Sequence, residues 1–269
     1  MKRIAWFVGI GVLLIASAVG AETVVSTHAV FGEIAEIVGG GEIEVVTIIP
    51  SGFCPAQYDL APSDLVAVLD ATLILYSGFE LWMETLAAGS GADLVQLPGD
   101  WGTPDAAVEK TEAIRDSLSG RFPELASTFA ANADAYIDRL LDLKASLVSR
   151  AEELNVSSIS VLCMAWQADF VSWLGFDVAA TYGPPAGLTL RDLVRLADAG
   201  SSSGAELVID NLQSGVEFGG KLAREIAAIH VVLSNFPGAM PDTATVLDLL
   251  ARNAEALFAA IEPWEEVSP

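Results

Sequence analysis

Histidine and cysteine are scarce in this chain. His28, His230, Cys54 and Cys163 are the only residues of these two types among 269. Two cysteines outside the cytoplasm can form one disulfide, bind a soft metal or stay as separate thiols, and the sequence leaves these alternatives open. His28 ends a predicted strand and can face a ligand there, whereas His230 begins an apolar strand and is interpreted as structural.

Basic residues are also few. Only 13 lysines and arginines stand against 36 acidic residues, which gives a net charge of -23. Nucleic acid is excluded as a partner, because phosphate binding needs a basic surface. The acidity favours solubility and equally suits a field that attracts cations, and net charge alone does not choose between the two.

The usual sequence motifs of enzymes are missing. The chain has no GxSxG, HExxH or CxxC motif and no phosphate-binding glycine loop. Catalysis by Cys54 would need a base within hydrogen-bond reach, for which His28 is the one candidate. We therefore predict that the protein is not an enzyme, and keep a cysteine-dependent enzyme as an alternative.

The N-terminus has the pattern of a secretory signal. A basic start, MKR, is followed by an apolar run from Ile4 to Val19 and by small residues before Glu22. The run is shorter than a comfortable membrane span, and an uncleaved N-terminal anchor is the alternative. We expect the rest of the chain on the periplasmic or extracellular face of the membrane, either free or tethered by this segment.

Eight short runs rich in valine and isoleucine alternate with segments of helical period. They span 23–27, 43–49, 72–76 and 93–97 in the first half, and 158–162, 178–182, 206–209 and 230–233 in the second. Continuous apolar strands separated by helices indicate parallel sheets covered on both faces. The predicted fold class is α/β, with two Rossmann-like lobes.

One long amphipathic segment separates the two halves. Its apolar residues recur at spacings of three, four and seven from Phe122 to Leu154, and Pro123 suits the first turn of a helix. A helix of about 32 residues would reach roughly 48 Å and could join two lobes rigidly. We predict a signal peptide or anchor at 1–21, an N-terminal α/β lobe at 22–120, a connecting helix at 121–155 and a C-terminal α/β lobe at 156–269.

Three stretches resemble the solute-binding proteins of ABC transporters for zinc and manganese. PSGFCPAQYDLAPSD at 50–64 is similar to that family's PxGxDPHxYEPTPSD loop, and TVVSTHAVFGEIAEIVGG from Thr23 is similar to its opening strand and helix. The long central helix is similar to its backbone helix. The resemblance implies a monomer that captures a solute in a cleft between two lobes and delivers it to a membrane permease and its ATPase.

The metal ligands of that family do not carry over. By the resemblance, its three histidines and two acidic ligands fall on Ala56, on Gly99, on Met164 or Cys163, on Asn211, and on Ser234 or Asn235. The aspartate of the loop motif falls on Cys54. Since every expected imidazole and carboxylate is replaced, the identity of the solute stays open.

Two kinds of solute fit the replaced site. A soft metal ion such as copper or zinc, carried as the transported solute, would be held by thiolate, thioether and imidazole. Its candidate ligands are Cys54, Cys163, Met164 and His28. A metal chelate or small polar organic solute would instead meet amides and aromatic faces. Its candidate binding residues are Cys54, Gln57, Tyr58, Trp166, Gln167, Tyr182, Asn211, Gln213 and Asn235, with Trp101 as a further aromatic face.

A disulfide between Cys54 and Cys163 is the remaining alternative. It needs the two Cα atoms within about 7 Å of each other. Such a bond would lock the lobes together and make the protein a scaffold or an adhesin-like protein.

Overall fold

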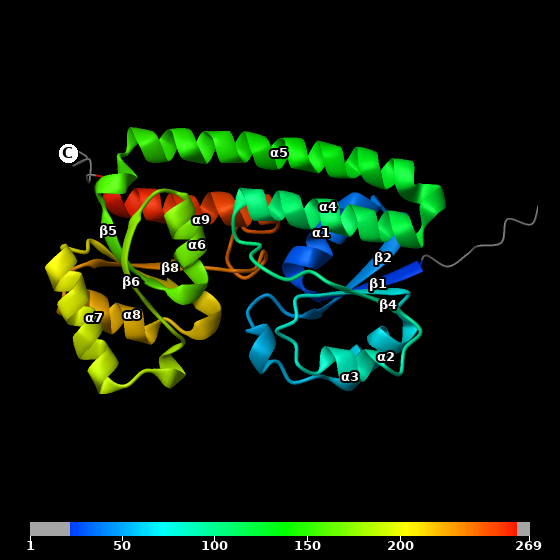
Figure 1. Cartoon of the computed structure of the whole chain (residues 1–269), viewed down its shortest axis with the longest axis horizontal. Helices are drawn as coiled ribbons and strands as arrows, with labels where there is room; N and C mark the ends of the chain where they lie inside the picture. Colours follow the sequence, from blue (N-terminus) through cyan, green and yellow to red (C-terminus); the bar gives the residue numbers. More distant parts are fainter. Residues whose placement is uncertain (1–21, 263–269) are drawn as a thin grey trace, which may run out of the picture.

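The computed structural model describes residues 22–262 and contains two four-stranded parallel sheets. The predicted signal segment, 1–21, lies outside the described residues. The first sheet has the order β2-β1-β3-β4 and the second the order β6-β5-β7-β8 (Figure 1). The strands are β1 (Glu22–His28), β2 (Ile43–Ile49), β3 (Leu73–Tyr76), β4 (Asp93–Gln96), β5 (Ser160–Met164), β6 (Asp177–Tyr182), β7 (Leu207–Asn211) and β8 (Ile229–Leu233). The predicted α/β fold class is confirmed.

The helices cover both faces of the sheets. They are α1 (Ala29–Gly39), α2 (Pro62–Asp70), α3 (Met83–Ala87), α4 (Pro104–Arg121), α5 (Ala126–Glu153), α6 (Ala168–Trp173), α7 (Leu190–Ser203), α8 (Glu217–Glu225) and α9 (Val246–Ile261). Helix α5 runs along both lobes with α1, α4 and α9 beneath it, whereas α2, α3, α7 and α8 lie on the opposite side (Figure 1). None of the helices between residues 22 and 262 is both long and apolar enough to cross a membrane.

Local sequence explains where several helices begin and end. Helices α7 and α9 each start with a reciprocal pair, Thr189 with Asp192 and Thr245 with Asp248. In each pair the threonine hydroxyl accepts from the backbone N–H of the aspartate, and the aspartate carboxylate accepts from the backbone N–H of the threonine. Helix α1 ends where Gly40 adopts a φ of +60°, a conformation that glycine reaches without steric cost.

The central strands are buried on both faces, as parallel strands require. Val24 and Val25 of β1 point to opposite faces and are both fully buried. Val24 belongs to a core that continues through Phe129 and Leu140 of α5 to Val161 of β5. Each such side chain contributes ~1.5–3 kcal/mol on burial. One core beneath α5 therefore holds both sheets.

The connecting helix starts later than the sequence predicts. Phe122 leaves the helical region (φ -127°, ψ 69°), and Pro123 begins a separate 3-10 turn, η2 (Pro123–Leu125). Helix α5 then covers 28 residues, about 42 Å at 1.5 Å per residue. Helix α4 packs alongside it, which the sequence analysis did not predict. Because α4, α5 and α9 pack closely together, the division of the chain at 121 and 155 remains a proposal.

Candidate functional site

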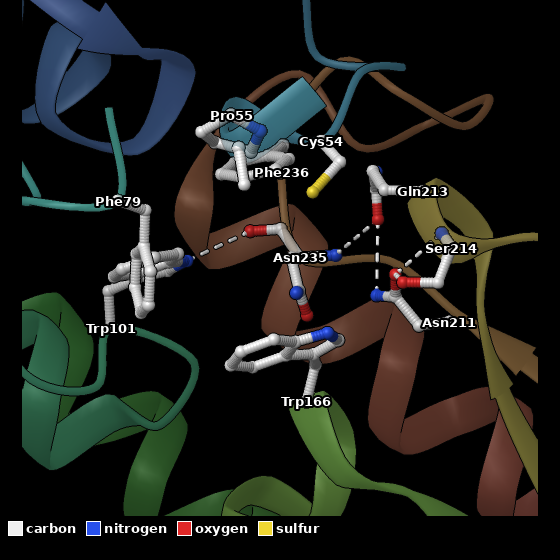
Figure 2. Close-up of a pocket in the computed structure, with 11 residues that line it drawn as sticks. Cys54, Pro55, Phe79, Trp101, Trp166, Asn211, Gln213, Ser214, Asn235 and Phe236 are labelled. Atoms are coloured by element: carbon white, nitrogen blue, oxygen red, sulfur yellow. Dashed lines mark hydrogen bonds between the residues drawn. The ribbon is translucent and has the colours of Figure 1, made fainter. Parts of the chain in front are cut away.

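A cavity of about 60 Å³ lies between the lobes at the carboxyl ends of the strands. Cys54 follows β2 and Trp101 follows β4 in the N-terminal lobe. On the other side, Trp166 follows β5 and Asn235 follows β8. The sulfur of Cys54 points into this space (Figure 2). The cavity therefore sits where ligands gather in open parallel sheets.

Four of the eleven residues that line this cavity are aromatic. Phe79 lies edge-on to Trp101 and to Trp166, with ring centroids 6.1 and 5.7 Å apart, so it spans the two lobes. Trp101 also stacks on Phe236 at 6.0 Å. Phe79 and Trp166 remain 43% and 49% exposed. The rings of Phe79 and Trp166 thus remain partly open to solvent where the lobes meet.

The side-chain amide of Gln213 is taken up by the protein itself. Its Nε2 donates to the main-chain oxygen of Ser51 and to Ser234 Oγ, both at 2.9 Å. Its Oε1 accepts from Asn211 Nδ2 and from the Asn235 backbone N–H, both at 3.2 Å. This amide therefore holds the loops after β2, β7 and β8 together, and its hydrogen-bonding groups are already used within the protein.

The side-chain amide of Asn235 is only partly used in hydrogen bonds to the protein. Its main-chain oxygen accepts from Trp101 Nε1 at 3.3 Å, and its Oδ1 accepts from Gln167 Nε2 at 2.7 Å. Among residues 22–262, no protein acceptor takes a hydrogen bond from Asn235 Nδ2. Asn211 is more committed, because its Oδ1 accepts from the N–H and hydroxyl of Ser214. The cavity thus offers few free polar groups.

A larger cavity of about 270 Å³ adjoins the first. The two share Phe79, Trp101, Trp166 and Asn235. The larger one adds two carboxylates, Asp100 from the N-terminal lobe and Asp169 from α6. The site is therefore a pair of spaces divided by aromatic side chains.

Six of the predicted ligand-binding residues line this pair of cavities. Five line the smaller one, namely Cys54, Trp166, Asn211, Gln213 and Asn235, and Gln167 lines the larger. The other three lie elsewhere, since Gln57 is exposed and Tyr58 donates to Asp64 at 3.0 Å beside α2. Tyr182 is buried and donates to Asp210 at 2.8 Å.

The predicted soft-metal ligands are not brought together at the cavity. Cys163 is buried in β5 and donates to the Met164 carbonyl at 3.3 Å. Burial raises the pKa of its thiol, so the sulfur stays protonated. Met164 is also buried, and its sulfur accepts from the Trp166 N–H at 3.3 Å. Of the four predicted metal ligands, only Cys54 lines either cavity.

His28 lies behind the aromatic wall rather than in the cavity. Its ring is 4.0 Å from that of Phe31, 4.7 Å from Trp101 and 5.2 Å from Phe236, centroid to centroid. Both ring nitrogens are buried without a hydrogen-bond partner. Burial lowers the pKa of His28 to about 4, although the nearby Glu80 carboxylate raises it. The imidazole is therefore neutral at physiological pH.

No metal-binding constellation occurs in the described part of the chain. Within residues 22–262, no three histidines, cysteines, aspartates or glutamates are grouped so that they could hold an ion. Both cysteines are free thiols, Cys54 half-buried and Cys163 buried. His230 lines neither cavity, and its Nε2 lies 2.8 Å from Asp210 in the C-terminal lobe.

The sequence analysis missed Phe79, Phe236 and the two carboxylates. Phe79 and Phe236 each lie three residues beyond the end of a strand, β3 and β8 respectively. The rule that placed Cys54 at the ligand-facing edge would have placed them there too. Asp100 and Asp169 carried no comparable signal, because acidic residues are abundant throughout the chain.

The sequence of the chain is similar to those of known metal-binding proteins. Residues 24–260 match the profile described as "ZnuA: Zinc-uptake complex component A periplasmic". The manganese-binding lipoprotein MntA of Halalkalibacterium halodurans is 29% identical over 54% of this chain and 58% of its own length. The zinc-binding lipoprotein AdcA of Streptococcus pneumoniae is 26% identical over 46% of this chain and 32% of its own.

Solved structures show the same fold. The manganese-bound periplasmic metal binding protein of Candidatus Liberibacter asiaticus superposes with a TM-score of 0.80 at 16% identity. That match covers 90% of this chain and all of the other. The chain spans about half the length of the curated relatives it matches. The likeness in structure therefore extends further than the likeness in sequence.

Proposed function

The chain belongs to the ZnuA family of periplasmic zinc-uptake components, and on that premise we propose that it is the extracytoplasmic solute-binding component of an ABC transporter. It would bind its solute between the lobes and deliver it to a membrane permease and its ATPase. The proposal assigns no catalytic residue.

The aromatic inter-lobe site supports a solute different from the bare divalent ion that the family name suggests. Metal sites for zinc and manganese are built from imidazole and carboxylate, with thiolate also suiting zinc. The cavities here offer indole and phenyl faces, two separate carboxylates and one thiol. We propose that the solute is a small organic molecule or a metal chelate whose outer surface is organic.

The close packing of both lobes against α5 is compatible with a solute-binding role. Helix α5 buries Phe129, Ala133, Tyr136, Leu140 and Leu147 in the core shared by both lobes. Large hinge motion would break that packing, so solute entry is expected through local movement of loops around the cavities. Phe79 and Trp166, which meet across the lobes and are both exposed, are placed for that movement.

Protein purified without denaturation tests the proposal. Mass spectrometry of the released small molecules, paired with elemental analysis, should find an organic compound in stoichiometric amount. Trp166→Ala should lose the compound, whereas Leu141→Ala on the exposed face of α5 should keep it. One equivalent of metal with no organic compound would overturn the proposal.

A further inference from the structure

We infer that the solute is a small organic cation, held against the indole faces of Trp101 and Trp166 with its charge opposite Asp100 and Asp169. This inference rests on the proposed function and names its class of solute. It uses the larger cavity as the main site and the smaller one as its extension toward Cys54.

The aromatic cluster has the composition that organic cations prefer. Tryptophan gives the strongest cation–π attraction of the aromatic side chains, and the attraction grows when the site is desolvated. Trp101, Trp166 and Phe79 border both cavities and come from both lobes. A compact ammonium group entering between the lobes would therefore touch more than one ring.

The charged groups around the larger cavity favour a cation as well. Asp169 lines it from the first turn of α6, and among residues 22–262 its carboxylate has no hydrogen bond or ion pair to protein. Asp100 lines it from the facing loop, where its Oδ1 accepts from the Gly102 N–H at 2.9 Å. No lysine, arginine or histidine lines either cavity.

Lys110 lies beside this loop, and it lines neither cavity. Its side chain is buried, and its ammonium donates to the main-chain oxygen of Pro98. Asp100 interacts with it electrostatically, so Lys110 offsets part of that carboxylate's charge. Asp169, an exposed carboxylate, has no basic side chain among the residues that line the cavity.

An inorganic cation and a neutral solute would each use fewer of the groups that line the cavities. A hard ion such as Ca²⁺ takes six to eight oxygen ligands, and Mg²⁺ takes six. Asp100 and Asp169, from opposite lobes, do not supply such a set. A neutral aromatic or aliphatic solute would use the rings but leave the carboxylates without a role. The net charge of -23 also draws cations toward the protein from solution.

Choline and its uncharged carbon isostere, 3,3-dimethylbutan-1-ol, separate the contribution of charge from that of shape. Calorimetric titration and quenching of tryptophan fluorescence should show choline binding about tenfold more tightly, since 1.4 kcal/mol corresponds to a factor of ten. Trp166→Ala should weaken choline about tenfold, and Trp166→Phe should restore part of the loss. Asp169→Asn should weaken choline and leave the alcohol unchanged, whereas Asp142→Asn on α5 should change neither.

The outcomes that contradict the inference are distinct from those that contradict the proposed function. Equal affinity for choline and the alcohol, or no effect of Asp169→Asn, overturns the cation preference and leaves an organic-solute binder in place. Failure of choline and of tetramethylammonium to bind at tens of millimolar also overturns the cation preference. Saturable Zn²⁺ or Mn²⁺ binding without binding of either organic probe overturns both.

Discussion

Gln213 Nε2 donates a hydrogen bond to the main-chain oxygen of Ser51 over 2.9 Å, joining the C-terminal lobe to the N-terminal lobe. Ser51 follows β2, three residues before Cys54, and the same Nε2 bonds Ser234 after β8. One amide thus connects the loop that carries Cys54 to the loop that carries Asn235. The contact fixes the distance between two walls of the smaller cavity.

Gln213→Glu should open this contact. A carboxylate cannot donate to the Ser51 carbonyl and would repel it, so we expect the free energy of unfolding to fall by ~1–3 kcal/mol. Urea unfolding measures the loss. Gln57→Glu is the matched control, because Gln57 is exposed and should change stability by less than ~0.5 kcal/mol. Equal effects of the two changes would show that the cross-lobe bond carries no stability.

Glu33 couples stability to pH where three helices meet. Tyr136 of α5 donates to its carboxylate at 3.1 Å, and the carboxylate also accepts from the Val246 N–H at the start of α9. Burial raises the pKa of Glu33 from 4.5 to about 7, although both hydrogen bonds lower it, and Glu36 and Asp248 raise it further. The folded state therefore keeps a proton that the unfolded state releases between these values.

The stability that Glu33 provides is lost as pH rises. It is fully present below pH 4.5 and disappears as the pH passes through about 7, by up to ~3 kcal/mol at 1.36 kcal/mol per pKa unit. Glu33→Gln cannot ionise, so it should become steadily more stable than the wild type from pH 5 to pH 8 in thermal unfolding. Glu124→Gln, an exposed control, should follow the wild type throughout. A constant difference between Glu33→Gln and the wild type would contradict the assignment.

His28 gives stability the opposite dependence on pH. Its folded-state pKa of about 4 lies below the ordinary 6.5, chiefly because of burial, so stability is present above pH 6.5 and is lost as the pH falls toward 4. His28→Leu removes two unpaired nitrogens from an aromatic environment. We expect it to be neutral or stabilising at pH 7 and to flatten the loss of stability in acid, as measured by urea unfolding at pH 7, 6 and 5.

His230→Leu provides the contrast. His230 lies 2.8 Å from the buried Asp210 carboxylate, and losing this partner should cost ~1–3 kcal/mol at pH 7. If His28→Leu is as damaging as His230→Leu at neutral pH, the imidazole of His28 has a partner that the structure does not show.

The two cysteines should differ in reactivity. Cys54 is half-buried at the smaller cavity, whereas Cys163 is buried with a raised thiol pKa. Ellman's reagent should therefore titrate one thiol rapidly in the native protein and two in denaturant. Cys54→Ser should abolish the fast reaction and Cys163→Ser should preserve it. Absence of free thiols in denaturant would establish the disulfide-locked alternative.

The strands and their ligand-facing edge could be predicted because they depend on local pattern. All eight valine- and isoleucine-rich runs form strands, with boundaries shifted by no more than two residues; the two-residue shifts occur at both ends of β5, which reaches Met164, and at the end of β7, which reaches Asn211. The later end of β5 changes the interpretation of the site, because Cys163 and Met164 are buried within the strand instead of following it. A strand's end cannot be located from apolar pattern when the residues that follow it are themselves apolar.

The polar chemistry of the site depended on tertiary contacts that no spacing reveals. Gln213 and Asn235 looked like solute ligands by position, yet Gln213 bonds Ser51 and Ser234, and Asn235 accepts from Trp101. Tyr182 looked like an aromatic wall because it ends β6, but its hydroxyl turns inward to Asp210. The hydrogen-bond partner of an amide or hydroxyl depends on which distant loops pack beside it, and this cannot be read from sequence spacing.

Calorimetric titration of Zn²⁺ and of Mn²⁺ into chelator-treated protein tests the central claim most directly. The account predicts no saturable one-to-one binding in the micromolar range for either ion, in the wild type and in Cys54→Ser alike. A stoichiometric micromolar or tighter site that Cys54→Ser removes would contradict it, because the inter-lobe cavity would then be a metal site.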